Sequence, residues 1–181
     1  MKGIDKLQLL QHLEERVKQH VFETIHHFKN KSESTLLAPA SNGGWSIAQC
    51  LDHLNSYGRY YLPEIRKGIE AMNRKAQNQT FVSTWLGSYF KKMMEPNTGK
   101  RKYKAFKNHF PNQHLDAFEV VAEFINQQEV LITYLHKAKE ANLDTPIPIS
   151  ISKWVRLKMG DVFQFVIAHN ERHLQQAKRN L

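Results

Sequence analysis

The feature that most constrains the fold is a helical spacing of apolar residues, which recurs in four long stretches of the chain. In residues 4–28 apolar side chains return every three or four positions and so share one face of a helix. They are Leu7, Leu10, Leu13, Val17, Val21, Ile25 and Phe28. The same spacing marks residues 46–72, 115–142 and about 158–179. We therefore predict four long amphipathic helices, with Ser46 as the N-cap of the second.

The connection between the second and third helices, residues 73–112, is long and lacks this periodicity except for a short helix at 84–94. Its helix breakers are Gly87, Pro96, Gly99 and Pro111. A shorter segment, residues 144–152, contains two prolines and is expected to be extended. The long crossover predicts an all-α bundle that is not simple up-down-up-down. We expect the crossover to border the functional cleft, because long connections in compact domains are usually functional or disordered.

The size and the cysteine count indicate one domain, residues 1–181, in a reducing compartment. A chain of 181 residues buries enough surface to fold without disulfides or a structural metal. Cys50 is the only cysteine, so no internal disulfide forms and the cytoplasm is the expected location. No apolar run reaches the ~18 residues that a membrane span needs, and the first residues are amphipathic and include acids. We expect no signal peptide and no membrane partner.

The formal net charge of +9 raises the question of a nucleic-acid partner. The clustered bases are few and lie in the central crossover: Lys91, Lys92, Lys100, Arg101, Lys102, Lys104 and Lys107. No helix-turn-helix or aromatic-basic platform accompanies them. We expect a solvated basic surface and no nucleic-acid partner; alternatively, the positive field attracts a small anionic substrate or cofactor.

Three histidines lie on inward faces of the predicted helices. His169 and His173 are four residues apart, about 40° around one helix, and continue the apolar stripe of Val162. His53 lies on the second helix, on a face that is polar and aromatic rather than aliphatic. Histidines from facing helices are typical of metal sites in bundle cores. Taken alone, each of the three is better explained as a satisfied core or boundary residue.

Several neighbours are candidates to orient these histidines or a substrate. Gln49, Tyr57 and Tyr60 share the face of His53, and Gln176 lies one turn after His173. Cys50 is better explained as a small buried hydrophobe than as a fourth ligand. We assign no general base, because Glu64 lies about 16 Å along the helix from His53. The remaining histidines are expected at the surface: His12, His20, His26, His27, His109, His114 and His136.

Several short motifs, in this order and spacing, resemble the DinB-like superfamily over nearly the whole chain. They are Gly44-Trp45-Ser46-Ile47 through His53-Leu54, then Trp85-Leu86-Gly87 and Phe106, then Gly160-Asp161-Val162, and finally His169 through His173 to Gln176. The resemblance implies a four-helix bundle with up-down-down-up topology and a divalent metal, most often zinc or nickel, on three histidines. His53, His169 and His173 occupy those positions.

The resemblance also implies thiol chemistry, because the superfamily includes bacillithiol S-transferases and thiol-dependent isomerases. A metal on three imidazoles keeps an open position, where it acidifies a water or deprotonates a thiol. The favoured function is therefore a metal-dependent transferase that activates a low-molecular-weight thiol toward a small-molecule substrate. A metal-dependent hydrolase remains open, and so does a non-enzymatic bundle with a structural, sensory or vestigial metal. A homodimer is left open.

Overall fold

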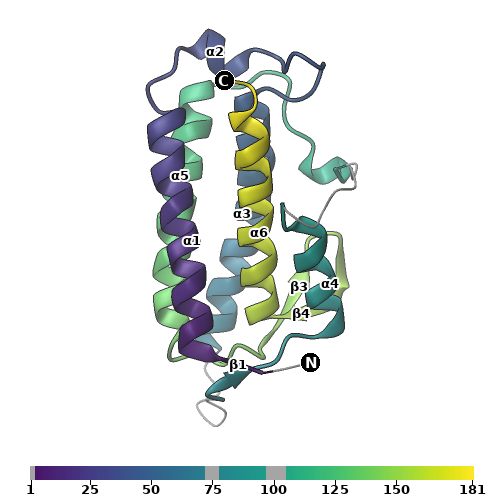
Figure 1. Cartoon of the computed structure of the whole chain (residues 1–181). Coiled ribbons are helices and arrows are strands. Elements are labelled where there is room, and N and C mark those ends of the chain that lie inside the picture. The colour runs from purple at the N-terminus through teal and green to yellow at the C-terminus, as the bar shows by residue number, and fades with distance from the viewer. Residues whose placement is uncertain (1–2, 72–77, 97–104) are drawn as a thin grey trace.

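A computed structural model describes residues 3–71, 78–96 and 105–181 of the chain (Figure 1). In this part of the chain no helix is long and apolar enough to cross a membrane. The helices are α1 (Lys6–His27), α2 (Glu33–Leu37), α3 (Ile47–Glu70), α4 (Trp85–Met94), the 3₁₀ helix η1 (Lys107–His109), α5 (Ala117–Ala138) and α6 (Met159–Lys178). The strands are β1 (Ile4–Asp5), β2 (Thr80–Phe81), β3 (Pro146–Ile149) and β4 (Ser152–Lys158).

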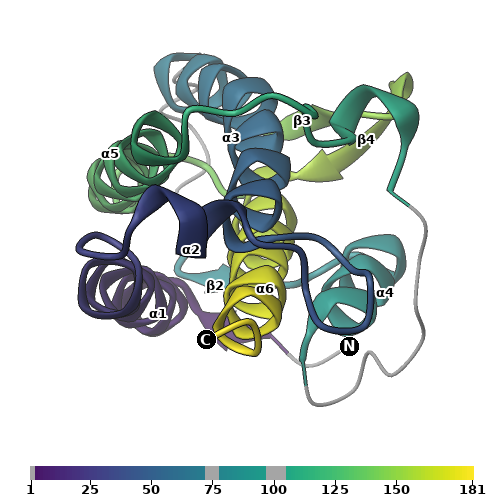
Figure 2. The same ribbon diagram turned by 90° about the horizontal axis from the view of Figure 1, so that it is seen from above.

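The four long helices α1, α3, α5 and α6 lie side by side (Figures 1 and 2). Helix α5 packs between α1 and α3, and α6 packs on the other side against the same two helices. In Figure 1, α1 and α6 run toward the end that holds the C-terminus, whereas α3 and α5 run away from it. The prediction of four long helices is therefore confirmed.

The start of α3 is fixed by its own sequence. Ser46 accepts a hydrogen bond from the backbone N–H of Gln49 at 3.1 Å, and its own N–H donates to the Gln49 side chain at 3.0 Å. This reciprocal capping box satisfies two donors that the first helical turn leaves free. Ser46 is thus the N-cap, as predicted, and α3 continues as one helix through Pro63.

Two small antiparallel sheets modify the all-α prediction. Strand β1 pairs with β2, and β3 pairs with β4 in a hairpin. The segment 144–152 is partly extended, as expected, but its strand pairs with residues up to Lys158, immediately before α6. Strand β4 has only seven residues and no strict apolar alternation, so its sequence gives a weak strand signal beside a long helix. The chain is mainly helical, with a hairpin packed beside α3 (Figure 2).

The buried stripe of α1 differs from the predicted one. Leu7 and Ile25 are exposed, whereas His20 and Thr24 are buried. After Val17 the buried face of α1 includes these two polar residues, so the spacing of apolar residues alone indicates the wrong face of the helix. The core of this protein therefore contains polar side chains.

The core consists of two apolar clusters, one at each end of the bundle. Leu13, Tyr61 and Leu131 belong to one cluster, and Leu51 and Phe124 belong to the other. On each long helix the residues between the clusters include buried polar side chains. These are His20 and Thr24 on α1, His53 and Asn55 on α3, Gln127 and Gln128 on α5, and His169 and Asn170 on α6. We call this set, together with the half-buried His173 of α6, the polar layer.

Helix α4, in the crossover, is docked onto α6. The buried carboxylate of Asp161 accepts hydrogen bonds from the backbone N–H and the hydroxyl of Thr84, at 3.0 and 2.9 Å. A Cβ atom at Gly87 would collide with this carboxylate, so glycine allows the close approach. At the other end of α4, Glu95 pairs with Arg16, which also pairs with Glu171. Residues 84–95 of the crossover therefore pack against α6 and reach α1.

Candidate metal centre

Helices α3 and α6 bring His53, His169 and His173 together in the polar layer. The imidazole centroids lie 4.6 to 5.1 Å apart. The Nε2 atoms of His53 and His169 are 3.2 Å apart, and one nitrogen from each of the three rings lies within 4.8 Å of the others. His169 and His173 are neighbours because four residues make about one helical turn. His53 joins them because α3 packs against α6.

Hydrogen bonds at the outer nitrogens orient two of the rings. His53 Nδ1–H donates to the backbone carbonyl of His109 at 2.6 Å, and His173 Nδ1–H donates to the Gln176 side-chain oxygen at 3.0 Å. Both acceptors require the proton on Nδ1, which leaves the lone pair on Nε2. His169 Nδ1 is buried without a hydrogen-bond partner among the described residues. The tautomers of His53 and His173 are thus set by their surroundings.

All three imidazoles are neutral near pH 7. Burial lowers the pKa of His53 to about 4 and that of His173 to about 3. Burial also lowers the pKa of His169 well below its ordinary value, and the neighbouring His173 and His53 add to this effect. A metal binds the neutral form of histidine, so protons compete weakly for these lone pairs at neutral pH.

The donor set fits a divalent cation. The Nε2 lone pair of His53 faces His169 Nε2 at 3.2 Å, a separation that fits either a proton on His169 Nε2 or a cation shared by the two nitrogens. Imidazole nitrogen suits several divalent transition metals, among them zinc, copper, iron and nickel. No fourth His, Cys, Asp or Glu joins the three histidines within the residues that the structure describes. A metal held here would therefore keep an open coordination position.

Aromatic rings form the walls of the centre. Trp45 lies against His53, with centroids 4.9 Å apart, and stacks on His173 at 6.0 Å. Tyr57 contacts His53 and His169 edge-on at 5.1 and 4.5 Å. Burial raises the pKa of the Tyr57 hydroxyl, so it stays protonated and available as a donor. Phe165 stacks on His169 at 5.8 Å. Within these walls His53 and His169 are buried and His173 is half-buried.

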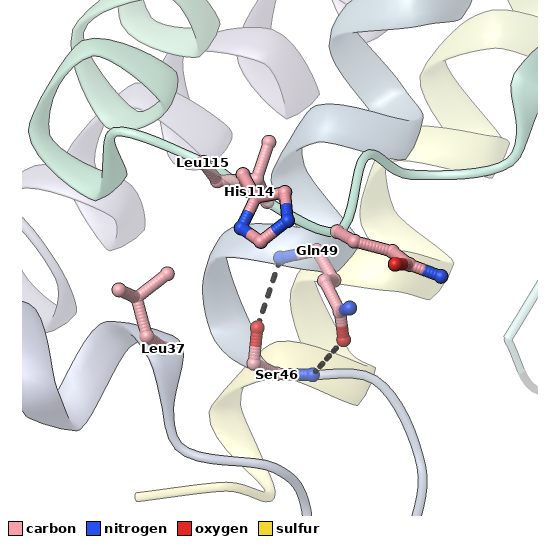
Figure 3. A pocket seen from close by; sticks show the side chains of 6 residues that line it. Leu37, Ser46, Gln49, His114 and Leu115 are labelled. Carbon is pink, nitrogen blue, oxygen red and sulfur yellow. Dashed lines mark hydrogen bonds between the residues drawn. The ribbon is translucent and has the colours of Figure 1, made fainter.

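The structure separates the residues that were expected beside the histidines. Gln176 and Tyr57 contact them, as described above. Gln49 instead closes the capping box with Ser46 and lines a cavity of 260 Å³, which none of the three histidines lines (Figure 3). Tyr60 donates to the Ile149 carbonyl of β3 at 3.1 Å. Within the described residues it makes no ring contact or hydrogen bond with any of the three histidines. Cys50 is buried in an apolar cluster.

Two histidines that were expected at the surface are buried. His109 is 5% exposed and His20 is 2% exposed. His109 reaches the centre from η1, and its ring stacks on Tyr57 with centroids 3.8 Å apart. No periodicity surrounds His109 in the sequence, so local pattern gave no signal for it. His20 was missed because it continues a stripe that the apolar residues of α1 do not mark.

The crossover borders the centre through the residues that follow its gap. Residues 105–112 contribute the His109 carbonyl to His53, and Phe110 packs edge-on against Trp45 at 5.8 Å. Residues 73–77 and 97–104 of the predicted crossover lie outside the described residues. In its described parts, the crossover thus contacts both α6 and the histidine cluster.

A family model described as the DinB superfamily matches residues 16–177, which include all three histidines. The chain belongs to the DinB superfamily. No curated protein and no solved structure matches it. The motif resemblance noted in the sequence is therefore confirmed at the level of the family, and within this DinB superfamily protein the histidine cluster is a candidate metal centre.

Proposed function

We propose that this DinB superfamily protein is a metal-dependent transferase that activates a low-molecular-weight thiol, on a bundle with up-down-down-up topology. One observation carries the proposal: three neutral imidazoles converge, and no fourth protein ligand joins them among the described residues. Three protein ligands with an open position are typical of catalytic zinc sites, whereas structural sites are closed by a fourth.

The ligands would be His53, His169 and His173, and the metal would be zinc or nickel. When bound, such a metal supplies a Lewis acid that lowers the pKa of a coordinated thiol or water into the physiological range. A thiol is the favoured occupant because the superfamily resemblance implies thiol transfer. The formal net charge of +9 also favours the approach of an anionic thiol, although this field acts on any anion.

The chain's own side chains would perform three tasks. Gln176 accepts the Nδ1–H of His173 at 3.0 Å. This hydrogen bond would hold the His173 ring so that its Nε2 faces the metal. Trp45 covers His53 and His173 and keeps bulk water from them. Tyr57, protonated at neutral pH and in ring contact with His53 and His169, would donate a hydrogen bond to the bound substrate.

The test combines elemental analysis of the purified protein with a thiol-conjugation screen, run with the metal found and after its removal. We expect about one divalent ion per chain and transfer only in the metal-loaded protein. Tyr57→Phe should lower kcat/KM by about 10-fold without changing metal content, as expected for one lost hydrogen bond.

The matched control is Tyr134→Phe, a partly buried tyrosine of α5. It should leave both metal content and transfer unchanged. A metal-free protein would refute the metal centre. A fully loaded protein that transfers no thiol from a panel of small thiols would refute the transferase and leave hydrolysis or a non-enzymatic role.

A further inference from the structure

The residues that follow the second gap of the crossover lie directly on the histidine cluster. We call residues 107–112, which comprise η1 and the three residues after it, the crossover clasp. It contacts a candidate ligand through the His109 carbonyl, which accepts the Nδ1–H of His53 at 2.6 Å. The orientation of His53 therefore depends on a backbone group 56 residues away, and not only on its own helix.

We propose that Ser56 and Asp52 are positioning residues of the metal centre: they dock the crossover clasp on α3, and the docked clasp holds His53 as a ligand. The proposal rests on the proposed function in one respect, since it assumes that His53 binds a metal. It adds that metal affinity depends on residues that do not touch the metal.

Ser56 forms the first anchor. Its hydroxyl donates to the His53 carbonyl at 2.7 Å, one turn back on α3. A hydroxyl has a single proton, so at the 2.9 Å contact between Ser56 Oγ and His109 Nδ1 the imidazole is the donor. The same ring stacks on Tyr57 at 3.8 Å and is 5% exposed. The His109 side chain is thus fixed on the face of α3 that carries His53.

Asp52 forms the second anchor. Its Oδ2 accepts the backbone N–H of Asn112 at 3.0 Å, and its Oδ1 lies 3.6 Å from the Arg59 guanidinium. Asp52 is 4% exposed, whereas Arg59 and Asn112 are exposed, so the buried carboxylate reaches its partners at the surface of the bundle. The two anchors flank His53 in sequence, one residue before it and three residues after it. They hold both ends of the His109–Asn112 stretch, whose first carbonyl reaches His53.

The burial of His109 also has a cost that the anchors must offset. Its Nε2 is buried with no hydrogen-bond partner within the described ranges. An unpaired buried polar atom opposes docking, so the clasp would detach more readily without its anchors. Because the clasp carries the carbonyl that orients His53, detachment would release His53 Nδ1. Loss of such an outer hydrogen bond typically lowers metal affinity by about 10- to 100-fold.

Coupling of this kind is reciprocal. If clasp docking strengthens metal binding, then metal binding strengthens clasp docking by the same factor. Hydrogen exchange at the amides of the clasp therefore reports on the metal without any measurement of activity. The Asn112 N–H, bonded to Asp52, is the most direct reporter.

The experiment measures Zn²⁺ affinity by chelator competition and the visible spectrum of the Co²⁺-loaded protein. We expect Ser56→Ala and Asp52→Ala each to weaken Zn²⁺ binding by about 10-fold and to shift the Co²⁺ spectrum. Ser56→Thr keeps the hydroxyl and should restore both. Thr133→Ala is the matched control, because Thr133 also donates to a carbonyl of its own helix but lies on α5; it should change neither.

In the wild-type protein, saturating Zn²⁺ should slow exchange of the Asn112 amide by about 10-fold, and this measurement needs no variant. The inference would be overturned if both alanine variants bind Zn²⁺ with unchanged affinity, or if Zn²⁺ does not change the exchange rate of the Asn112 amide. Either result would leave the metal centre intact. A wild-type protein that binds no Zn²⁺ would overturn both. Coupling without thiol transfer would refute only the transferase.

Discussion

The polar layer has two sides that look alike by burial and differ in what their histidines can do. On one side, His53, His169 and His173 converge between α3 and α6. On the other, His20 of α1 lies near Gln128 of α5, which accepts a hydrogen bond from Asn170 of α6 at 3.0 Å. Burial lowers the pKa of His20 to about 3, the same value as for His173.

The difference lies in the partners of the ring nitrogens. His53 and His173 each donate from Nδ1 to a fixed oxygen and present Nε2 to the cluster. Neither nitrogen of His20 has a hydrogen-bond partner in the part of the chain that the structure describes, and His20 belongs to no group of three candidate ligands there. A lowered pKa therefore marks burial in both places. Convergence and outer hydrogen bonds distinguish the candidate metal centre.

The largest expected effect breaks the converging side. His173→Ala removes one of the two neighbouring ligands on α6, so we expect Zn²⁺ affinity to fall by more than about 100-fold, beyond the loss typical of an outer partner. The protein should remain helical and unfold cooperatively, because its core is large enough without metal. Unpaired groups left in the site should cost about 1–3 kcal/mol. Metal content, circular dichroism and thiol transfer on one preparation measure all three.

His114→Ala, at an exposed histidine, is the control for this experiment and should leave metal content unchanged. Full metal occupancy in His173→Ala would rule out the ligand assignment. Lost metal with retained turnover would instead separate the cluster from catalysis.

The next effect concerns the other side, and it depends on pH. Because the pKa of His20 is lowered to about 3 in the folded protein, the unfolded chain binds a proton below about pH 6.5 that the folded chain does not. His20 therefore destabilises the fold as pH falls below about 6.5. The free energy of unfolding of His20→Leu, taken relative to that of wild type, should therefore be about 2 kcal/mol higher at pH 5 than at pH 7.5. Urea unfolding at the two pH values measures this gain.

The leucine side chain also changes the free energy of unfolding through its apolar burial. This contribution does not depend on pH, so it cancels when the two pH values are compared. Zn²⁺ affinity should stay at the wild-type value, since His20 contributes no ligand atom to the cluster. The idea that the two sides are independent fails if His20→Leu weakens Zn²⁺ binding as strongly as His173→Ala.

The smallest effect sharpens the role of the outer hydrogen bonds. Gln176→Ala removes the acceptor of His173 Nδ1–H and leaves the ligand in place, so Zn²⁺ affinity should fall by about 10-fold. Gln19→Ala is the control, because Gln19 donates to Glu23 on the exposed face of α1. Equal affinities for the two variants, measured by chelator competition, would show that Gln176 does not orient His173.

The sequence predicted local features well where a single helix contains the whole signal. Apolar spacing located all four long helices, and the Ser46 N-cap was recognised because its partner Gln49 is only three residues away. The neighbourhood of His169 and His173 follows from helix geometry in the same way. The motifs together identified the family, which the match over residues 16–177 confirms.

Features that depend on contacts between distant segments were decided only by the tertiary structure. The histidine cluster joins atoms 116 residues apart, and the His53–His109 contact spans 56 residues. Periodicity places a side chain on a face of its own helix but does not say which nitrogen meets which partner. For that reason Gln49 and Tyr60, on the correct face of α3, lie outside the cluster, whereas His109, in a stretch with no pattern, contacts it. A polar residue such as His20 gives no apolar signal, so only packing could reveal that it is buried.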